Sequence, residues 1–296
     1  MENTIILTLS LGAALAGNII KKLYIKADNR FCGSFFYTFG VGLICATVLF
    51  IWGGLGEVSS FTLLLGVIFG LVTALQCVTN LLALQIGPLS YTSVIISFST
   101  LISALSGVVW FGESIGILQI VGILLMLASF WLANGKDANG KRASIKWLIL
   151  CSVAFFATGA IGILQKLHQS SPHKEELNAF LIVAFAVSST LSGILFLFLQ
   201  SRTRSDKKEM STKKCSLMLL LLGLLAVGGF CVAVNNKFNL YLSGVIPSAV
   251  FFPLVNGGGL ILTTLAALLI FRERLTVKQW IGVGLGIASV LLLCIS

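Results

Sequence analysis

The chain has 296 residues, of which 57% are hydrophobic and only 10% are charged. Soluble proteins carry about 25% charged residues, so this composition excludes a water-soluble globular protein and indicates an α-helical membrane protein. The net charge is +10, but the lysines and arginines stand in short loops between apolar segments, which is a pattern of membrane topology and disfavours nucleic-acid binding.

Apolar segments follow one another along the whole chain, each near the roughly 20 residues that a helix needs to cross the hydrocarbon core. We expect ten membrane-spanning helices, at residues 3–25, 33–52, 61–84, 88–110, 115–134, 145–167, 177–200, 215–241, 245–270 and 276–295. The first segment lacks the basic start and cleavage site of a signal peptide, so it is interpreted as a retained helix. Several connections are very short, which predicts antiparallel neighbours.

Positive charge is distributed unevenly between the two sides of this arrangement. With the N-terminus outside, 17 of the 20 lysines and arginines fall in loops on the inner side. Because cytoplasmic loops carry the excess of positive charge, both termini are predicted to lie outside. The stretch from Gln200 to Lys214 is then a cytoplasmic loop, whose basic residues either determine topology or bind anionic lipid.

The two halves of the sequence contain a repeat. At an offset of 160, residues 105–132 match residues 265–292 at nine of 28 positions. The polar and small matches include Glu113 with Glu273, Gln119 with Gln279, Gly122 with Gly282, and Ser129 with Ser289. We therefore expect two five-helix repeats, at 1–135 and 145–296. An odd number of helices per repeat makes the copies insert in opposite orientations, as in many secondary transporters with a site between the halves.

Two motifs give the sequence a family resemblance. The first is Trp110-Phe111-Gly112-Glu113 with Gln119 and Gly122 after it, and the second is Phe271-Arg272-Glu273 with Gln279 and Gly282 after it. The chain thereby resembles the EamA-type transporters of the drug/metabolite transporter superfamily. The resemblance implies two five-helix bundles around a central cavity, lined mainly by the third, fourth, eighth and ninth helices, and alternating access for small metabolites. Arg272 departs from Gly112 of the first copy, so the loop chemistry differs between the halves.

Polar side chains within the spans are the candidate substrate site. Helical spacing places Gln76 and Asn80 on one face of the third span, next to a hydroxyl stripe on the fourth. Hydroxyls also join helices or bond to their own backbone, and beside Gln76 and Asn80 the two interpretations are equally supported. The candidate substrate-binding residues are Asn18, Gln76, Asn80, Tyr91, Ser93, Ser97, Thr158, Asn236 and Asn256.

Asn256 lies in an unusual segment of the ninth span, between Pro253 and the glycines at 257–259. Proline removes a helical donor and glycine weakens a helix, so this segment either unwinds and exposes backbone groups to substrate or packs closely against a neighbouring helix. Two further glycine pairs are expected to be helix-packing motifs: Gly66 with Gly70, and Gly282 with Gly286.

No aspartate or glutamate lies at the middle of any predicted span, which disfavours a simple cation, and the polar groups there are amides, hydroxyls and a few lysines, which favour neutral, zwitterionic or anionic substrates. Glu113 and Glu273 lie at helix junctions, where a carboxylate is expected to cap a helix N-terminus. Lys21 and Lys22 close the first span and Lys166 closes the sixth. These lysines either anchor the helices at the interface or attract an anionic substrate to the two cavity mouths.

We expect a multi-pass protein of the cell membrane that moves a small polar metabolite by alternating access. Its partners are the substrate and membrane lipids, with no nucleic acid, while the cargo and the oligomeric state are not encoded in a recognisable motif. One alternative is an exchanger of anionic phosphorylated or nucleotide-linked substrates, for which Lys22 and Lys237 would supply positive charge.

Functions of another class are a membrane-embedded lipid-modifying enzyme and a flippase subunit. Such an enzyme needs an acid, base or metal set, and His168 and His173 beside Glu175 and Glu176 form the only such grouping. The seven cysteines are scattered and form no CxxC pair, so no metal site or disulfide framework is expected. We expect no catalytic residue and no cofactor.

Overall fold

The structure of the chain is a computed structural model, and it describes residues 2–28, 30–86, 92, 95–133, 144–202, 212–270 and 276–295. These residues fold into α-helices and one short 3-10 helix, and no strand occurs among them. The helices are α1 (Glu2–Ala27), α2 (Phe31–Gly53), α3 (Ser60–Ile86), α5 (Thr100–Phe111), α6 (Ile117–Ala133), α7 (Ile145–Gln169), η1 (Lys174–Glu176), α8 (Leu177–Arg202), α9 (Thr212–Val245), α10 (Ser248–Ile270) and α11 (Val277–Ile295). The chain is therefore all-helical, as its composition predicts.

Within the described ranges, 6 helices are long and apolar enough to cross a membrane, and the shorter apolar helices include Ile95–Phe111, Ile117–Ser129 and Trp280–Leu293. Large apolar side chains face outward on many of them, for example Ile51, which is 79% exposed, and Trp131, which is 69% exposed. A surface of this kind fits lipid and not water. The protein is a membrane protein with multiple apolar helices.

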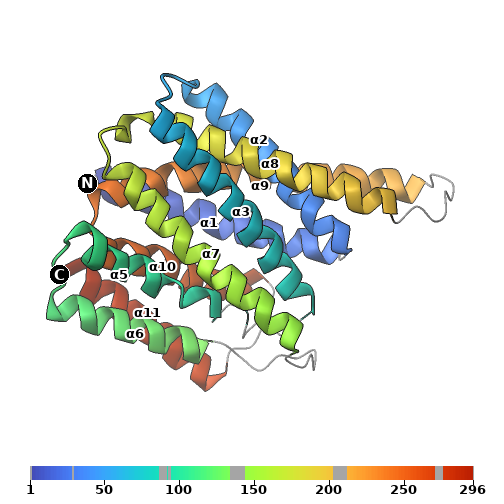
Figure 1. Cartoon of the computed structure of the whole chain (residues 1–296). Helices are drawn as coiled ribbons and strands as arrows, with labels where there is room; N and C mark the ends of the chain where they lie inside the picture. Colours follow the sequence, from blue (N-terminus) through green and yellow to red (C-terminus); the bar gives the residue numbers. More distant parts are fainter. Residues whose placement is uncertain are drawn as a thin grey trace.

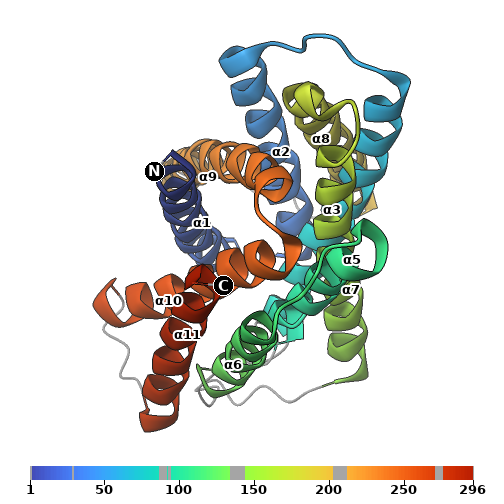
Figure 2. The same ribbon diagram turned by 90° about the vertical axis from the view of Figure 1, so that its left-hand side faces the viewer.

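Both chain termini lie at the same end of the helix array (Figure 1). We call this end the terminal end; Figure 2 looks onto it. A shared side for the two termini agrees with the charge distribution in the sequence, and the assignment of that side to the exterior stays a prediction.

The fourth predicted span, residues 88–110, is the one whose predicted bounds differ most from the observed helix. The structure has a turn at Phe98–Ser99, and α5 begins only at Thr100. Here the Ser99 amide donates to the Ile96 carbonyl (3.0 Å) and the Ile102 amide donates to the Ser99 carbonyl (2.9 Å). Bonds between residues three apart tighten the chain into a 3-10 turn, which an apolar run does not reveal.

The most extensive packing joins the first five helices to the last five. α2 packs on α8 and on α9, α6 packs on α11, α1 packs on α9, and α3 packs on α7 and on α8. These pairs lie side by side in both views (Figures 1 and 2). The two halves are thus interleaved, so any cavity at the centre of the molecule has walls from both.

Glycines permit this close packing. A Cβ atom at Gly66 would lie 3.1 Å from Val183 Cγ1, and one at Gly70 would collide with the Ala184 carbonyl oxygen. A Cβ at Gly286 would lie 2.6 Å from Ser129 Oγ. The prediction that these glycines serve helix packing is confirmed.

The α6–α11 contact contains a reciprocal pair of hydrogen bonds. Ser129 Oγ donates to the Gly282 carbonyl at 2.6 Å, and Ser289 Oγ donates to the Gly122 carbonyl at 2.6 Å. All four residues belong to matched positions of the sequence repeat, and a shift of 160 residues converts one bond into the other.

Candidate functional site

A cavity of about 240 Å³ lies between helices of the two halves. Its walls come from α1, α2 and α3 on one side and from α7, α8 and α9 on the other. The polar residues in the wall are Asn18, Lys21, Tyr37, Thr38, Thr73, Gln76, Ser188, Asn235 and Asn236, and aromatic surface comes from Phe69 and Phe185. The cavity combines an apolar wall with a few hydrogen-bonding groups, as small-molecule sites do.

Helical periodicity brings these polar side chains to the cavity. On α1, Ala14, Asn18 and Lys21 recur at intervals of four and three residues and therefore share a face. On α3, Phe69, Thr73 and Gln76 repeat the same spacing. One stripe of each helix thus faces the cavity, while exposed neighbours such as Leu23 and Leu75 point outward.

Hydrogen bonds between α1 and α9 hold one wall in place. The fully buried Ser10 hydroxyl lies 2.6 Å from Asn239 Oδ1 and 3.0 Å from Asn235 Oδ1, and Asn239 Nδ2 donates to Asn235 Oδ1 at 3.1 Å. Asn236, the next residue, donates through Nδ2 to the Val232 carbonyl at 2.9 Å. The network fixes the Asn235 amide at the cavity wall. Nothing in the sequence singles out Ser10, because one serine in an apolar run is ordinary in a membrane helix.

Two groups in the wall form no hydrogen bond and no ion pair within the described residues. Lys21 forms no ion pair or hydrogen bond there, and no aspartate or glutamate lines the cavity. Thr73 Oγ1, on α3, is buried without a hydrogen-bond partner among the same residues. The half-buried Lys21 therefore faces the cavity without an acidic partner, and the buried Thr73 hydroxyl is left unsatisfied in this conformation.

The cavity brings together three of the predicted site residues: Asn18, Gln76 and Asn236. Asn80 and Ser97 do not line it, although Asn80 follows Gln76 by one helical turn. Tyr91 and Ser93 lie outside the described residues.

Two other predicted site residues have partners elsewhere. Thr158 Oγ1 donates to the Ala154 carbonyl at 2.7 Å, which is a bond within α7. Asn256 Nδ2 donates to Thr100 Oγ1 at 2.9 Å and so joins α10 to α5. Neither residue lines the cavity.

The glycine-rich segment around Asn256 does not unwind, because α10 continues unbroken from Ser248 to Ile270 with Pro253 inside it. A Cβ atom at Gly257 would collide with the Met126 side chain. Of the two interpretations of this segment, the structure supports close helix packing.

A second polar site lies at the terminal end, where Glu113 connects three helices. Gly112 has a φ of 63° and ends α5, and the Glu113 amide bonds back to the Gly107 carbonyl at 3.0 Å. The carboxylate then accepts the Ser248 amide at 2.7 Å and lies 2.6 Å from Lys166 Nζ, which also donates to the Ser243 carbonyl at 3.1 Å. Glu113 therefore caps a helix, as expected, but the helix is α10 of the other half.

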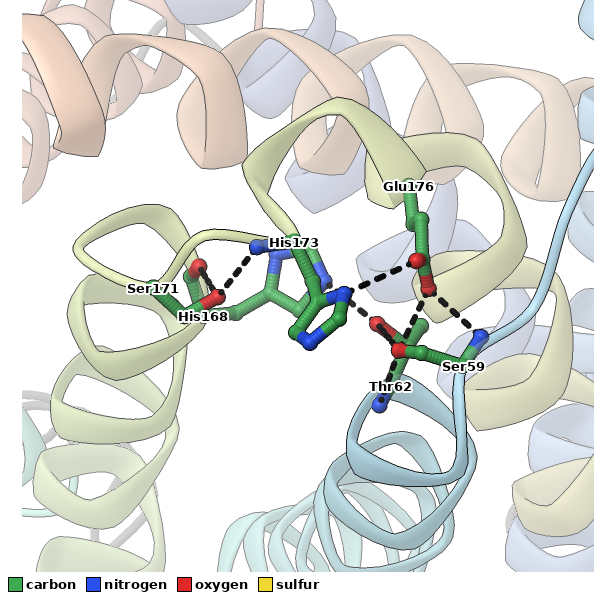
Figure 3. Close-up of polar contacts among 6 residues, drawn as sticks. All are labelled: Ser59, Thr62, His168, Ser171, His173 and Glu176. Carbon is green, nitrogen blue, oxygen red and sulfur yellow. Dashed lines mark hydrogen bonds and ion pairs between the residues drawn. The ribbon is translucent and has the colours of Figure 1, made fainter.

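The histidine and glutamate residues near the end of α7 form a third polar group (Figure 3). Glu176 Oε2 accepts from the Ser59 amide and hydroxyl, both at 2.8 Å, at the start of α3. His173 Nδ1 lies 3.1 Å from Glu176 Oε1, and the buried His168 lies 3.4 Å from Thr62 Oγ1. These contacts join the α7–α8 connection to α3.

The same group does not resemble a metal or acid–base centre. His168 stacks on Phe180 with ring centroids 4.4 Å apart, His173 stacks on Phe61 at 5.7 Å, and Glu175 lies exposed outside the group. Within the described ranges no set of three or more histidine, cysteine or acidic residues is arranged to hold a metal ion. The rings and the carboxylate are used for packing and capping.

Comparison with known proteins gives the chain a family. The model of the EamA-like transporter family matches residues 145–295, which is just over half of the chain. A solved structure named "Crystal structure of protein" superposes with a TM-score of 0.66 at 14% sequence identity, covering 98% of this chain and 96% of that chain, and this likeness concerns the fold alone. No curated protein matches the sequence. The chain belongs to the EamA-like transporter family, whose members carry small solutes across membranes.

Proposed function

We propose that the protein is a secondary transporter of the cell membrane that moves a small polar metabolite by alternating access. The observation that carries the proposal is the cavity of about 240 Å³ between helices of both halves, with Asn18, Gln76 and Asn236 in its wall. Secondary transporters place their substrate between structural repeats in this way. No catalytic activity is proposed, because His168, His173 and Glu176 are engaged in packing.

The proposed architecture is ten membrane crossings in two inverted repeats, at residues 1–135 and 145–296. The helices of the two halves correspond in chain order: α1 to α7, α2 to α8, α3 to α9, α5 to α10 and α6 to α11. When each helix is replaced by its counterpart, the α1–α9 contact becomes α7–α3 and the α3–α8 contact becomes α9–α2, and both of these contacts are present. The α2–α8 and α6–α11 contacts map onto themselves. This exchange, together with the reciprocal Ser129 and Ser289 hydrogen bonds, supports an internal two-fold relation.

In this conformation the terminal end is proposed to be closed. There Glu113 joins α5 to α7 and α10 across the two halves, and Glu176 joins η1 to the start of α3. Lys237 Nζ lies 4.1 Å from the Trp52 ring centroid, which connects α9 to α2. Opening this end requires these contacts to break, so they are the proposed gate.

The size of the cavity distinguishes between the proposed substrates. Sites for drug-sized ligands measure about 300–1,000 Å³, and this cavity is smaller. A small metabolite therefore has more support than a nucleotide-linked substrate. Lys237, suggested by the sequence as a contact for such anions, lies on Trp52 and outside the cavity wall.

The test is solute counterflow in proteoliposomes that contain the purified full-length protein. Liposomes loaded with an unlabelled metabolite receive the same labelled metabolite outside, over a panel of amino acids, organic acids, sugars and nucleosides. Alternating access predicts saturable, protein-dependent exchange for at least one class, and none with protein-free liposomes. A solute that binds the protein saturably but never exchanges would contradict transport.

A further inference from the structure

Lys21 is not at the end of its helix. α1 continues to Ala27, six residues beyond Lys21, which is about 9 Å at a rise of 1.5 Å per residue. The next residue, Lys22, is not part of the cavity wall, whereas Lys21 is. A lysine that served only as an interface anchor would extend toward the end of the helix and not into a cavity between the two halves.

The surroundings of Lys21 leave its charge without a counter-charge. Among the described residues, the cavity wall contains amides, hydroxyls, thiols and apolar groups but no carboxylate, and the ionisable side chain that interacts with Lys21 is the Cys77 thiol, not an acid. An ionisable residue inside a membrane is costly and marks a functional site when nothing in the protein balances it.

We propose that Lys21 is the counter-ion of a compact anionic group on the transported molecule, and that this group is a single carboxylate. The inference rests on the proposed transport function and names its substrate class. In the same wall, Gln76, Asn235 and Asn236 offer amides to the rest of the molecule, and Thr73 has a buried hydroxyl without a hydrogen-bond partner among the described residues.

Charge and size favour a carboxylate over a phosphate ester. One ammonium group balances one negative charge, whereas a phosphate monoester carries about 1.5 to 2 negative charges at neutral pH and leaves an excess in a low-dielectric site. The volume of about 240 Å³ also fits a small acid better than a sugar phosphate or a nucleotide.

The test measures binding to the full-length protein in detergent by thermal shift and isothermal titration calorimetry. The probes are two- to six-carbon carboxylic acids and amino acids, the matching uncharged amides, glycerol phosphate, and primary amines of the same size. We expect saturable binding of at least one carboxylate, and binding of its amide at least ten-fold weaker.

Variants assign that preference to Lys21. Lys21→Met is expected to weaken carboxylate binding at least ten-fold, Lys21→Arg to retain part of it, and Lys26→Met, an exposed lysine on the same helix, to bind as wild type does. Size-exclusion profiles and circular dichroism show that each variant is folded. The proposal is overturned if a folded Lys21→Met variant binds the carboxylate as well as the wild type does. It is also overturned if the wild type binds acid and amide equally, prefers glycerol phosphate or amines, or binds no carboxylate at all.

The same variants in the counterflow assay separate the two proposals. If the wild type binds a carboxylate through Lys21 but exchanges nothing, the transport function fails and the anion site stands. If the Lys21→Met variant exchanges solutes with the same kinetics as the wild type, the transport function stands and the anion site fails.

Discussion

The cavity and the terminal end are both built from the two halves of the chain, but they use polar residues differently. At the terminal end, Glu113 meets Lys166 and Ser248, and Glu176 meets Ser59 and His173. In the cavity, Lys21 meets no acidic side chain and the Thr73 hydroxyl has no hydrogen-bond partner among the described residues. Buried polar groups that are satisfied by the protein hold it together, and those left unsatisfied are available for a ligand. We therefore expect opposite results when a polar group is removed: loss of stability at the terminal end, and loss of function without loss of stability at the cavity.

The largest effect is expected at the terminal end, from Glu113→Ala. Side-chain exposure is 9% for Lys166 and 16% for Glu113, so the variant leaves a mostly buried charge unpaired. Breaking such a pair costs about 3 kcal/mol in the free energy of unfolding. Chemical denaturation in detergent measures it, with the exposed Glu57→Ala as control. The Glu113→Gln/Lys166→Met double variant is expected to recover most of the loss.

A smaller loss of stability is expected from Glu176→Gln. The amide keeps the shape of the side chain but weakens its hydrogen bonds with Ser59 and His173. The unfolding temperature should fall, by less than for Glu113→Ala, and the exposed neighbour Glu175→Gln should leave it unchanged. Equal unfolding temperatures for the Glu176 and Glu175 variants would show that Glu176 does not hold the two halves together.

Loss of a polar group from the cavity is expected to act on function and not on stability. Thr73→Val removes a hydroxyl without a partner, so the unfolding temperature should stay the same or rise. The KM of counterflow should rise about five- to ten-fold, the equivalent of one hydrogen bond of about 1 kcal/mol. Thr190→Val is the matched control, because its exposed hydroxyl bonds to the Ala186 carbonyl of its own helix. A drop in stability with an unchanged KM would remove the contrast between the two regions.

The smallest effect is expected at Asn256, which belongs to neither region. Its bond to Thr100 joins α10 to α5, so Asn256→Ala should lower the free energy of unfolding by about 1 kcal/mol and leave the KM unchanged. Asn236→Ala, in the cavity wall, should raise the KM instead. A raised KM in the Asn256 variant would place this residue back in the substrate site.

Most of the helices could be predicted from the sequence because lipid imposes a single requirement, a long apolar run. The turn at Phe98–Ser99 within the fourth span could not be predicted, because it is made of backbone bonds and leaves the run apolar. The predicted packing role of Gly66 and Gly70 is confirmed because small residues have few other uses between membrane helices.

The site was harder to predict, because a polar residue in an apolar helix has two common uses. Asn18, Gln76 and Asn236 line the cavity, whereas Thr158 bonds to its own helix and Asn256 to a neighbouring one. Polarity and spacing do not separate these uses, because the difference depends on what the facing helix presents.

The sequence treats Lys21 and Lys22 alike, as anchors or as charges at a cavity mouth. In the structure Lys21 lines the cavity and Lys22 does not, because adjacent residues of a helix face different directions. Thr73 was not selected because a threonine within an apolar run fits a membrane helix without further explanation.

The reciprocal bonds between α6 and α11 have a mechanical consequence. A helix contact that maps onto itself when the two halves are interchanged lies on the proposed two-fold axis between them. Atoms on that axis keep their positions when the halves interchange their conformations. If the halves exchange shapes to open opposite sides of the membrane, the Ser129–Gly282 and Ser289–Gly122 bonds exchange roles without lengthening. Under the proposed alternating access, this helix pair and the α2–α8 pair, which also maps onto itself, act as fixed pivots, while the contacts of Glu113 and Glu176 are broken and remade in every cycle.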